Sequence, residues 1–384
     1  MPALNPPIPL SQPDITQKEI DAVVEVMRTP TLSIGPKLDQ FETACAEIAG
    51  RRHGVGVSSG TAGLHCMMIA GGVGEGAEVI TTPFSFVASA NCVLYVGAKP
   101  VFVDIDPKTL NMDVDKVAAA ITPRTKAIVA VEVFGHPGGM IELEQLAQRH
   151  ELVLIEDACE GFGGKVGERR IGSFGRAGVF AFYPNKQITT GEGGMIVTDD
   201  DTFAATCRAL RNQGREGMAW LAHERLGYNY RLSELNSAVG YAQCQRLDEI
   251  LAARRRVAAL YMDRLMTNRF LILPTLQDDT YMSWFVFVVR LNDLFEPGDR
   301  DDVMIALREE GIGCNNYFPP IHLQPYMARL LGHKPGDFPV CEYVAARTLA
   351  LPFFGAMTGQ QVDRVCDTLE RVLERKLVAR KGRF

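Results

Sequence analysis

The sequence predicts an α/β fold, with a large domain built on a mainly parallel sheet covered by helices and a smaller α+β domain at the C-terminal end. Three observations predict it. From about Gly54 to Val197, short apolar runs alternate with stretches that have the pattern of helices. The apolar runs are hydrophobic at nearly every position, which is typical of strands buried on both faces of a parallel sheet. Past about Met266 the pattern changes, and a chain of 384 residues exceeds one ordinary domain.

Six apolar runs are the predicted strands of the large domain. Each ends in small or polar residues, and they are His53–Val57, Ala77–Ile80, Pro100–Val103, Ala127–Val133, Leu152–Ile155 and Gly178–Phe182. Predicted helices lie between most of them, namely Thr61–Ala70, Ser85–Val96, Val114–Ile121 and Ile141–His150. Strands and helices that alternate in this way form an α/β domain, in which ligands bind beyond the carboxyl ends of the strands.

A long helix is predicted from Ser233 to about Met266, with Ser233 as its N-cap and Gly240 as a weak point. Beyond it, Ser283–Leu291 has the pattern of a strand and Asp301–Glu310 that of a helix, and a last helix follows Thr358. We therefore expect a large domain over residues 1–249 and a small domain over residues 250–384, joined by the long helix.

The composition excludes several classes of protein. Forty Lys and Arg against 46 Asp and Glu give a net charge of −6, which disfavours binding to nucleic acid or to an anionic membrane. Nine cysteines, an odd number without a CxxC pair, argue against a disulfide framework or a metal site and favour a reducing compartment. No export signal and no apolar run of about 20 residues is visible, so we expect a cytoplasmic protein with no membrane contact.

The first segment with chemical potential is Ser58–Gly63, SSGTAG, which follows a predicted strand and opens a predicted helix. The free N–H groups and the dipole of such a helix start attract anions. Gly60 lets the backbone approach a ligand, and the hydroxyls of Ser59 and Thr61 can add hydrogen bonds. The segment is neither a P-loop nor a dinucleotide-binding GxGxxG motif, and a simple capped helix is the alternative interpretation.

A second candidate is the carboxylate pair Glu156 and Asp157, which ends a hydrophobic strand. Because side chains alternate along a strand, one carboxylate can face a ligand while the other has a structural task. Asp157 could hold a cation, a metal or a protonated ring nitrogen, or it could cap the next turn.

A third candidate is Lys186, which follows a buried apolar strand and precedes the glycine-rich turn TTGEGG. Lysine forms Schiff bases, and partial burial favours the neutral amine that this chemistry needs. A solvated surface lysine is the alternative.

An anion site, an aspartate and a lysine at the strand ends of one sheet are together what pyridoxal 5'-phosphate requires. The lysine carries the aldehyde, the aspartate keeps the pyridine nitrogen protonated, and a helix start takes the phosphate. The ring also needs a flat apolar surface, which Phe86 can supply unless it is a core aromatic residue.

The chain resembles the DegT/DnrJ-type nucleotide-sugar aminotransferases, which are pyridoxal-phosphate-dependent enzymes of fold type I. The resemblance runs from about Pro9 to Leu373. The matching segments are, in order, Gly35-Pro36 with Phe41-Glu42, SSGTAGL, TTPFSFVASAN, VGAKPVFVDID, IEDACEGFG, FYPNKQITTGEGG, LGYNYRLSEL and NNYFPPIHLQPY.

The resemblance implies a role for each matching residue. Lys186 would be the catalytic Schiff-base lysine and proton shuttle, Asp157 would pair with the pyridinium, and Phe86 would stack on the ring. The backbone of the Gly60 turn, at Thr61 and Ala62, would hold the phosphate. Asn229 would reach the phosphate of the other subunit's cofactor, so a homodimer with shared active sites is expected.

Three positions depart from the common family pattern. Glu160 stands where many relatives carry Gln or His near the phenolic oxygen of the cofactor, and a Glu there would be neutral or would repel a phenolate. Ala181 stands where many relatives carry a phosphate-binding Ser, so one phosphate contact should be missing. Gly139 replaces a common Asp.

Four residues are expected at the substrate: Arg231, Tyr317, His322 and Glu192. His322 would lie near the sugar nucleotide, with a satisfied loop histidine as the alternative. Arg231 is either a phosphate ligand or a structural partner of a carboxylate.

The resemblance implies an aminotransferase that moves an amino group from L-glutamate to a nucleotide-linked keto sugar in amino sugar or surface glycan synthesis. The stretch from Lys186 to Gly194 looks like the branch of the family that aminates C4. The alternatives are amination at C3 or of an amino-cyclitol, a sugar dehydratase on the same fold, and a non-catalytic regulator. Dehydratases of this kind often replace the lysine with His, so Lys186 counts against that alternative.

Overall fold

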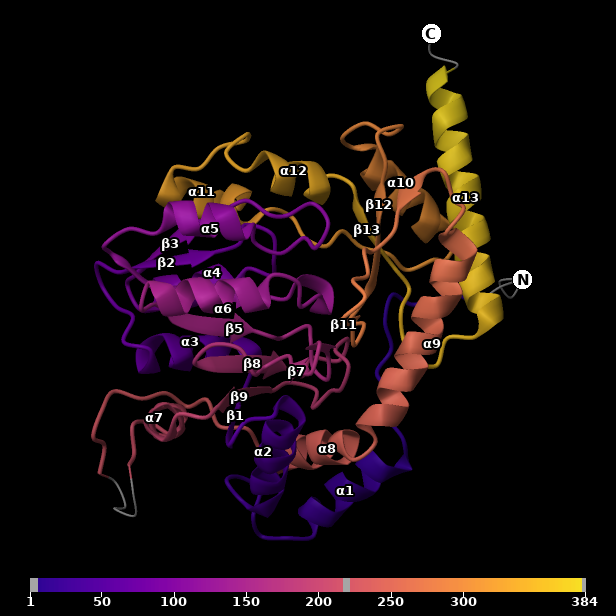
Figure 1. Ribbon diagram of the computed structural model, residues 1–384. Helices are drawn as coiled ribbons and strands as arrows, with labels where there is room; N and C mark the ends of the chain where they lie inside the picture. The colour runs from indigo at the N-terminus through magenta and orange to yellow at the C-terminus, as the bar shows by residue number, and fades with distance from the viewer. Residues whose placement is uncertain (1–5, 217–221, 382–384) are drawn as a thin grey trace.

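A computed structural model describes residues 6–216 and 222–381 of the chain. Its centre is a seven-stranded sheet in the order β1-β9-β8-β5-β4-β2-β3 (Figure 1). The strands are β1 (His53–Val57), β2 (Glu78–Thr81), β3 (Lys99–Phe102), β4 (Thr125–Val131), β5 (Val153–Asp157), β8 (Ala177–Ala181) and β9 (Gly194–Thr198). Neighbours from β3 to β8 run parallel, and β9 is antiparallel to both β1 and β8. The mainly parallel α/β fold expected from the sequence is confirmed.

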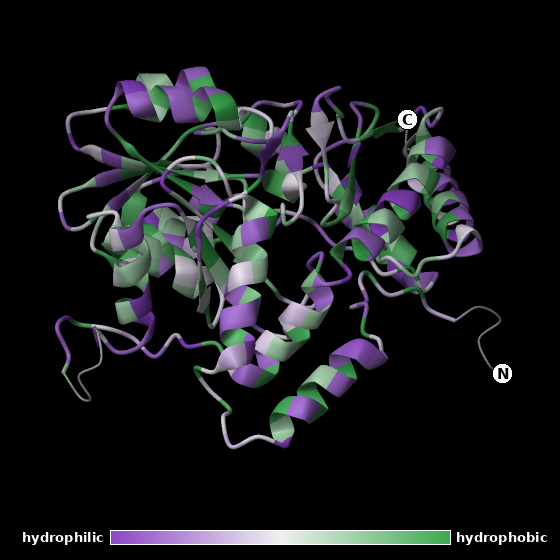
Figure 2. Cartoon of the chain, turned by 60° about the horizontal axis from the view of Figure 1, so that its bottom comes forward, coloured by the Kyte–Doolittle hydropathy of each residue, from purple (hydrophilic) through white to green (hydrophobic). Residues whose placement is uncertain are grey.

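Helices cover both faces of this sheet, because its strands carry apolar side chains on both. Val79, Val129 and Ile155 face a core that includes α3 (Gly60–Ala70), α4 (Ala88–Tyr95) and α7 (Asp201–Arg211). Ile80, Ile128 and Leu154 alternate with them and face α5 (Val114–Ala120) and α6 (Met140–Arg149). This packing agrees with Figure 2, in which the helices around the sheet carry both hydrophilic (purple) and hydrophobic (green) residues.

The N-terminal helices α1 (Gln17–Met27) and α2 (Pro36–Ala49) both pack against α8 (Glu234–Cys244), and α9 (Leu247–Leu265) follows. The single long helix expected from Ser233 is therefore two helices. The break lies at Gln245 and Arg246, not at Gly240, whose missing side chain lets the Phe41 ring approach. Arg246 forms ion pairs with Asp14 and Glu19, which hold the chain at the bend.

The C-terminal part has its own three-stranded antiparallel sheet. Its strands are β10 (Leu271–Ile272), β12 (Phe287–Leu291) and β13 (Thr348–Leu351). This sheet shares one hydrophobic core with α9, α10 (Asp299–Glu309) and α13 (Gly359–Lys381). In Figure 1, α9 and α13 lie side by side along this part of the molecule.

Two further contacts join the C-terminal part to the large sheet. β11 (Thr280–Tyr281) pairs with β6 (Lys165–Val166), which also pairs with β7 (Arg169–Arg170). The segment with η2 (Ile321–Leu323), α11 (Pro325–Leu331) and α12 (Pro339–Ala345) crosses back over the β3 edge, where Ile321 and Met327 pack on Ala90 and Phe102 (Figure 1). A short helical turn, η1 (Val133–Gly135), follows β4.

The division into two domains at residue 249 that the sequence predicts stays a prediction.

Within the described residues, every helix is either too short or too polar to cross a bilayer. The same residues contain no group of three or more His, Cys, Asp or Glu side chains arranged to hold a metal ion.

Candidate active site

A cavity of about 510 Å³ lies at the carboxyl ends of the central strands. This is the place where ligands bind in open α/β sheets. Its walls come from the loops after β1, β2, β5 and β8 and from the segments around Phe285 and Phe318. Eight of the residues expected at the site line it: Gly60, Thr61, Phe86, Asp157, Glu160, Lys186 and Glu192, and Tyr317 from the C-terminal part.

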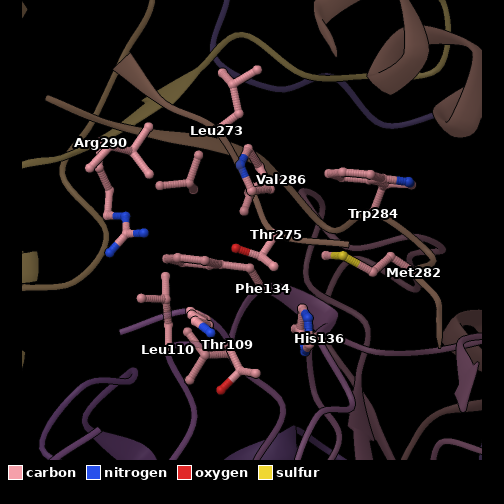
Figure 3. Close-up of a pocket in the computed structure, with 15 residues that line it drawn as sticks. Thr109, Leu110, Phe134, His136, Leu273, Thr275, Met282, Trp284, Val286 and Arg290 are labelled. Atoms are coloured by element: carbon pink, nitrogen blue, oxygen red, sulfur yellow. The ribbon is translucent and has the colours of Figure 1, made fainter. Parts of the chain in front are cut away.

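A second, much smaller cavity of about 30 Å³ lies behind one wall (Figure 3). The Phe134 ring, which lines it, stacks on the ring of Phe318, which lines the large cavity, with 5.5 Å between centroids. The small cavity has room for one or two water molecules and not for an organic substrate. The large cavity is therefore the candidate active site.

The start of α3 forms one end of the large cavity. Ser59 is the N-cap of this helix, and its hydroxyl accepts the Ala62 N–H at 3.1 Å. A Cβ atom at Gly60 would come within 2.8 Å of both Ala181 Cβ and Cys159 Sγ, so the turn needs a glycine. The N–H groups of Gly60 and Thr61 lie in the first turn, where a helix offers donors to an anion.

Asp157 ends β5 and points into the cavity, while Glu156 points the opposite way. The Asp157 carboxyl is 6% exposed, and its Oδ1 accepts the Cys159 N–H at 3.4 Å. Burial raises its pKa, and the nearby Lys186 ammonium opposes the shift. Glu156 accepts the N–H groups of Gly172 and Phe174 at 2.5 and 2.8 Å, so it holds a loop on the other face.

Lys186 lies in the turn after β8, and its side chain is 13% exposed. Its Nζ atom is 3.9 Å from the centroid of the Phe285 ring and 3.6 Å from Oε1 of Glu160. Hydrogen bonds fix the turn around it. The Lys186 N–H donates to the Tyr183 carbonyl at 2.9 Å, and the Thr189 N–H donates to Gln243 at 3.0 Å. The structure therefore presents one amine to the cavity between a carboxylate and an aromatic ring.

Glu160 is buried, and its second oxygen, Oε2, accepts the Phe134 N–H at 2.8 Å. Burial raises the pKa of its carboxyl, and the Lys186 charge lowers it. Phe86, by contrast, is 62% exposed and offers a free ring surface at the cavity.

Four expected site residues do not line the cavity of this chain. Ala62 lies one residue beyond the lining part of the α3 turn. Arg231 donates to Asn212 at 3.1 Å. His322 is fully buried. Its Nε2 atom pairs with Glu342 at 3.0 Å, whereas its Nδ1 atom has no hydrogen-bonding partner in the described part of the chain. Asn229 is exposed, although its neighbour Tyr230 accepts the Ser58 N–H at 2.8 Å, which places this segment beside the anion site.

The sequence did not predict the residues that form the cavity wall opposite the central sheet. Phe285 stands beneath Lys186, and the buried Arg254 donates to the main-chain oxygens of Trp284 and Phe285, both at 2.9 Å. A signal for Arg254 was present, because it continues the buried stripe of Ile250, Val257 and Tyr261 along α9. An arginine on the apolar face of a helix predicts a buried side chain that is paired with polar groups.

The arrangement fits pyridoxal phosphate. One amine, one buried carboxylate, one helix start and one free aromatic surface line the same cavity, and these are the groups that the aldehyde, the ring nitrogen, the phosphate and the ring face require.

The sequence pattern of the DegT/DnrJ/EryC1/StrS aminotransferase family matches residues 13–370. The GDP-perosamine synthase of Caulobacter vibrioides is 38% identical over 371 residues, which cover 96% of this chain and 99% of that protein. The structure of S. venezuelae DesV in complex with a ketimine intermediate is similar, with 33% identity, a TM-score of 0.90, and coverage of 96% and 99% of the two chains. The structure of DesI with its TDP-sugar product shows 32% identity, a TM-score of 0.89, and coverage of 100% and 97%.

Proposed function

The chain belongs to the DegT/DnrJ/EryC1/StrS aminotransferase family, and on this basis we propose that it moves an amino group from L-glutamate to C4 of a nucleotide-linked keto sugar. It is a pyridoxal-phosphate-dependent sugar aminotransferase. The donor, the position on the sugar and the nucleotide-linked substrate are the proposed parts.

The observation that carries the proposal is that Lys186, Asp157 and the start of α3 line one cavity. When bound, pyridoxal phosphate supplies an aldehyde that bonds to amino groups and a ring that accepts electrons from the adjacent carbon. Asp157 would hold a proton on the ring nitrogen, because a carboxylate buried beside a cation stabilises that cation. The N–H groups of Gly60 and Thr61 would bind the phosphate, and Phe86 would offer its ring surface to the cofactor ring.

Lys186 would take a proton from, and return one to, the reacting carbon of the substrate. Its amine reaches the cavity from a fixed turn, and a proton carrier must stand within hydrogen-bonding reach of the atoms that it serves. Glu192 and Tyr317 line the same cavity and are placed to contact the hydroxyl groups of a sugar. Arg231 and His322, which do not line it, act on the substrate only if a partner subunit or a bound ligand rearranges the site.

A nucleotide sugar is the proposed substrate because two similar proteins, GDP-perosamine synthase and DesI with its TDP-sugar product, carry a nucleotide or a nucleotide sugar in their names. Amination at C4 rests on the resemblance of the Lys186–Gly194 stretch to that branch of the family. The exposed position of Asn229, outside this chain's cavity and next to its anion site, supports a homodimer in which Asn229 serves the partner's phosphate.

A single assay tests the proposal. The protein is incubated in deuterium oxide with ¹⁵N-glutamate and a set of keto nucleotide sugars, and the products are read by mass spectrometry and NMR. We expect 2-oxoglutarate, a ¹⁵N-amino sugar and one deuterium at the aminated C4. Lys186→Ala is the matched control and should give none of these. A ¹⁵N-amino group at C3, or sugar deoxygenation without 2-oxoglutarate, would contradict the proposal.

A further inference from the structure

Glu160 and Lys186 form a buried ion pair inside the cavity. Oε1 of Glu160 lies 3.6 Å from Nζ of Lys186, and the two side chains are 7% and 13% exposed. Glu160 follows β5 and Lys186 follows β8, which are hydrogen-bonded neighbours in the central sheet. The sheet therefore fixes the distance between them, unlike a surface pair between flexible side chains.

The carboxyl of Glu160 is anchored on its far side. Oε2 accepts the Phe134 N–H at 2.8 Å, which leaves Oε1 toward Lys186. The main-chain oxygen of Glu160 accepts the Gln187 side-chain amide at 2.6 Å, and Gln187 directly follows Lys186. The residue next to Lys186 thus binds the backbone of Glu160. This bond helps the carboxyl and the amine to keep their relative position.

Lys186 has an aromatic ring on its other side. Nζ lies 3.9 Å from the centroid of Phe285, a distance at which a ring face attracts a cation. The ring also keeps water from that side of the amine. Water is therefore a poor proton partner in this direction, and Oε1 of Glu160 is an oxygen acceptor held close to the amine.

Burial makes proton exchange within the pair easier than in water. Two buried opposite charges each lose their hydration, and moving one proton from nitrogen to oxygen leaves two neutral groups without that penalty. The burial of Glu160 acts in the same direction, because it raises the pKa of the carboxyl against the effect of the neighbouring ammonium.

We infer that Glu160 is the proton partner of Lys186 in the proposed amino transfer. When the amine must be neutral, an N–H bond of Lys186 breaks and an O–H bond forms on Glu160. When a neutral amine beside the ionised carboxylate takes a proton from a substrate carbon, a C–H bond breaks as an N–H bond forms, and the carboxylate can then accept that proton and later return it. Exchange within the pair moves one proton and no electron and leaves the net charge of the pair unchanged, whereas the proton from carbon raises that charge by one until the proton is returned. This task rests on the proposed function and differs from the contact with a ring oxygen that the family resemblance implies.

Other titratable groups face the pair and must be considered in any test of pH dependence. They come from several elements around the cavity, and they are Asp157, Cys159, Tyr183, Glu192 and Tyr317. The Asp157 charge raises the pKa of Glu160, and the Glu160 charge raises that of Tyr317. A signal is therefore assigned to Glu160 only when it disappears in a Glu160 variant.

Competitive acetylation of Lys186 in the cofactor-free protein, followed by mass spectrometry across the pH range, tests the inference. In the wild type we expect labelling to rise in two steps, since a carboxyl and an amine this close titrate as a coupled pair. Glu160→Gln keeps an acceptor for Phe134 but cannot take the proton. We expect a single step in this variant and labelling about tenfold faster near neutral pH, as the amine loses its carboxylate. An unchanged curve would overturn the inference.

Glu192→Gln is the matched control, because it removes an acidic side chain from the same cavity, and among the described residues the ion pair of Lys186 is with Glu160. Its curve should keep two steps. A second measurement uses infrared difference spectra on loading pyridoxal phosphate, with the wild type and with Glu160→Ala, and it keeps the test open if Glu160→Gln fails to fold. The wild type should show the carbonyl band of a protonated carboxyl and Glu160→Ala should lack it; a band that is absent from the wild type or kept in the variant would overturn the inference. Neither readout needs amino transfer, so a failed proposed function would be recognised separately, by the isotope assay.

Discussion

The guanidinium of Arg254 donates a hydrogen bond to the main-chain oxygen of Asn185, the residue directly before Lys186, at 3.3 Å. The same side chain donates to the main-chain oxygens of Trp284 and Phe285. Burial lowers the pKa of Arg254 to about 10. A single arginine on α9 thus connects the turn that carries the amine to the wall beneath it.

Arg254→Met should weaken both stability and catalysis. The change leaves three main-chain oxygens without their donor, which should cost about 3 kcal/mol in the free energy of unfolding. Loss of the anchor at Asn185 should shift Lys186 and lower kcat by about 100-fold, with little change in KM for glutamate. Urea unfolding and steady-state kinetics measure the two effects. Arg255→Met, on the exposed face of the same helix, should cost less than about 1 kcal/mol; an equal loss in both variants would refute the anchoring role.

Ala181→Ser should tighten cofactor binding. Ala181 lines the cavity next to Gly60, where its Cβ lies close to the helix start. A hydroxyl there would add one hydrogen bond to the bound phosphate, which should increase the affinity for pyridoxal phosphate by about tenfold. Titration of the cofactor-free protein, followed by absorbance, measures the change. Ala181→Val adds bulk without a donor and should weaken binding. Equal affinities of the Ser variant and the wild type would show that the phosphate lies elsewhere.

Gly60→Ala should disturb the anion site. A Cβ atom at this position would overlap Ala181 and Cys159 at 2.8 Å, so the first turn of α3 must move. We expect a stability loss of about 1–3 kcal/mol and a faster loss of cofactor on dialysis. Gly74→Ala is the matched control, since a Cβ atom at Gly74 would meet nothing within 4 Å among the described residues. Identical behaviour of the two variants would argue against close packing at the turn.

Glu132→Gln should stabilise the protein at alkaline pH. Both carboxyl oxygens of Glu132 are buried, and when the carboxyl is protonated it can donate to the neighbouring Glu156 carboxylate. Burial and the nearby Glu156 raise its pKa well above the ordinary range. The folded state therefore keeps a proton that the unfolded chain loses near about pH 4.3, so stability falls as the pH rises from there toward the raised pKa.

Glutamine carries no such proton, so the gain from Glu132→Gln should be small at about pH 4 and should grow by about pH 8. Urea unfolding at both values measures it. Glu78→Gln should behave in the opposite way. Hydrogen bonds from Thr122 and Arg124 lower the pKa of Glu78, so its contribution is present above about pH 4.3 and is lost in acid. A gain from Glu132→Gln that does not depend on pH would mean that Glu132 is not held protonated.

Much of this architecture could be predicted from local sequence patterns. The apolar runs predicted the parallel strands because burial on both faces leaves few polar positions to confuse the pattern. Lys186, Asp157 and Gly60 could be placed at one edge because the carboxyl ends of parallel strands meet there. The short strand Gly194–Thr198 was missed, since the glycine-rich turn before it masks where it begins.

Other features depend on contacts between residues far apart in the sequence. The break between α8 and α9 is stabilised by Arg246 with Asp14 and Glu19, more than 200 residues away. The buried His322 is paired with Glu342 in α12, and the position of Phe285 beneath Lys186 depends on Arg254. No local periodicity contains such information, so the cavity wall and the place of His322 could be found only from the structure.

The passage of η2, α11 and α12 back over the β3 edge has a consequence for how the molecule holds together. The Val340 and Cys341 N–H groups donate to the buried Asp104, which lies in the loop after β3, at 3.0 and 2.8 Å. The N-terminal residue Ile8 pairs in turn with Ile312 in the C-terminal part. The C-terminal part therefore binds the part that carries the large sheet, and the N-terminal segment binds the C-terminal part. A fragment cut at residue 249 would expose apolar surface at Phe102 and should aggregate. Heating should melt the intact chain in one transition.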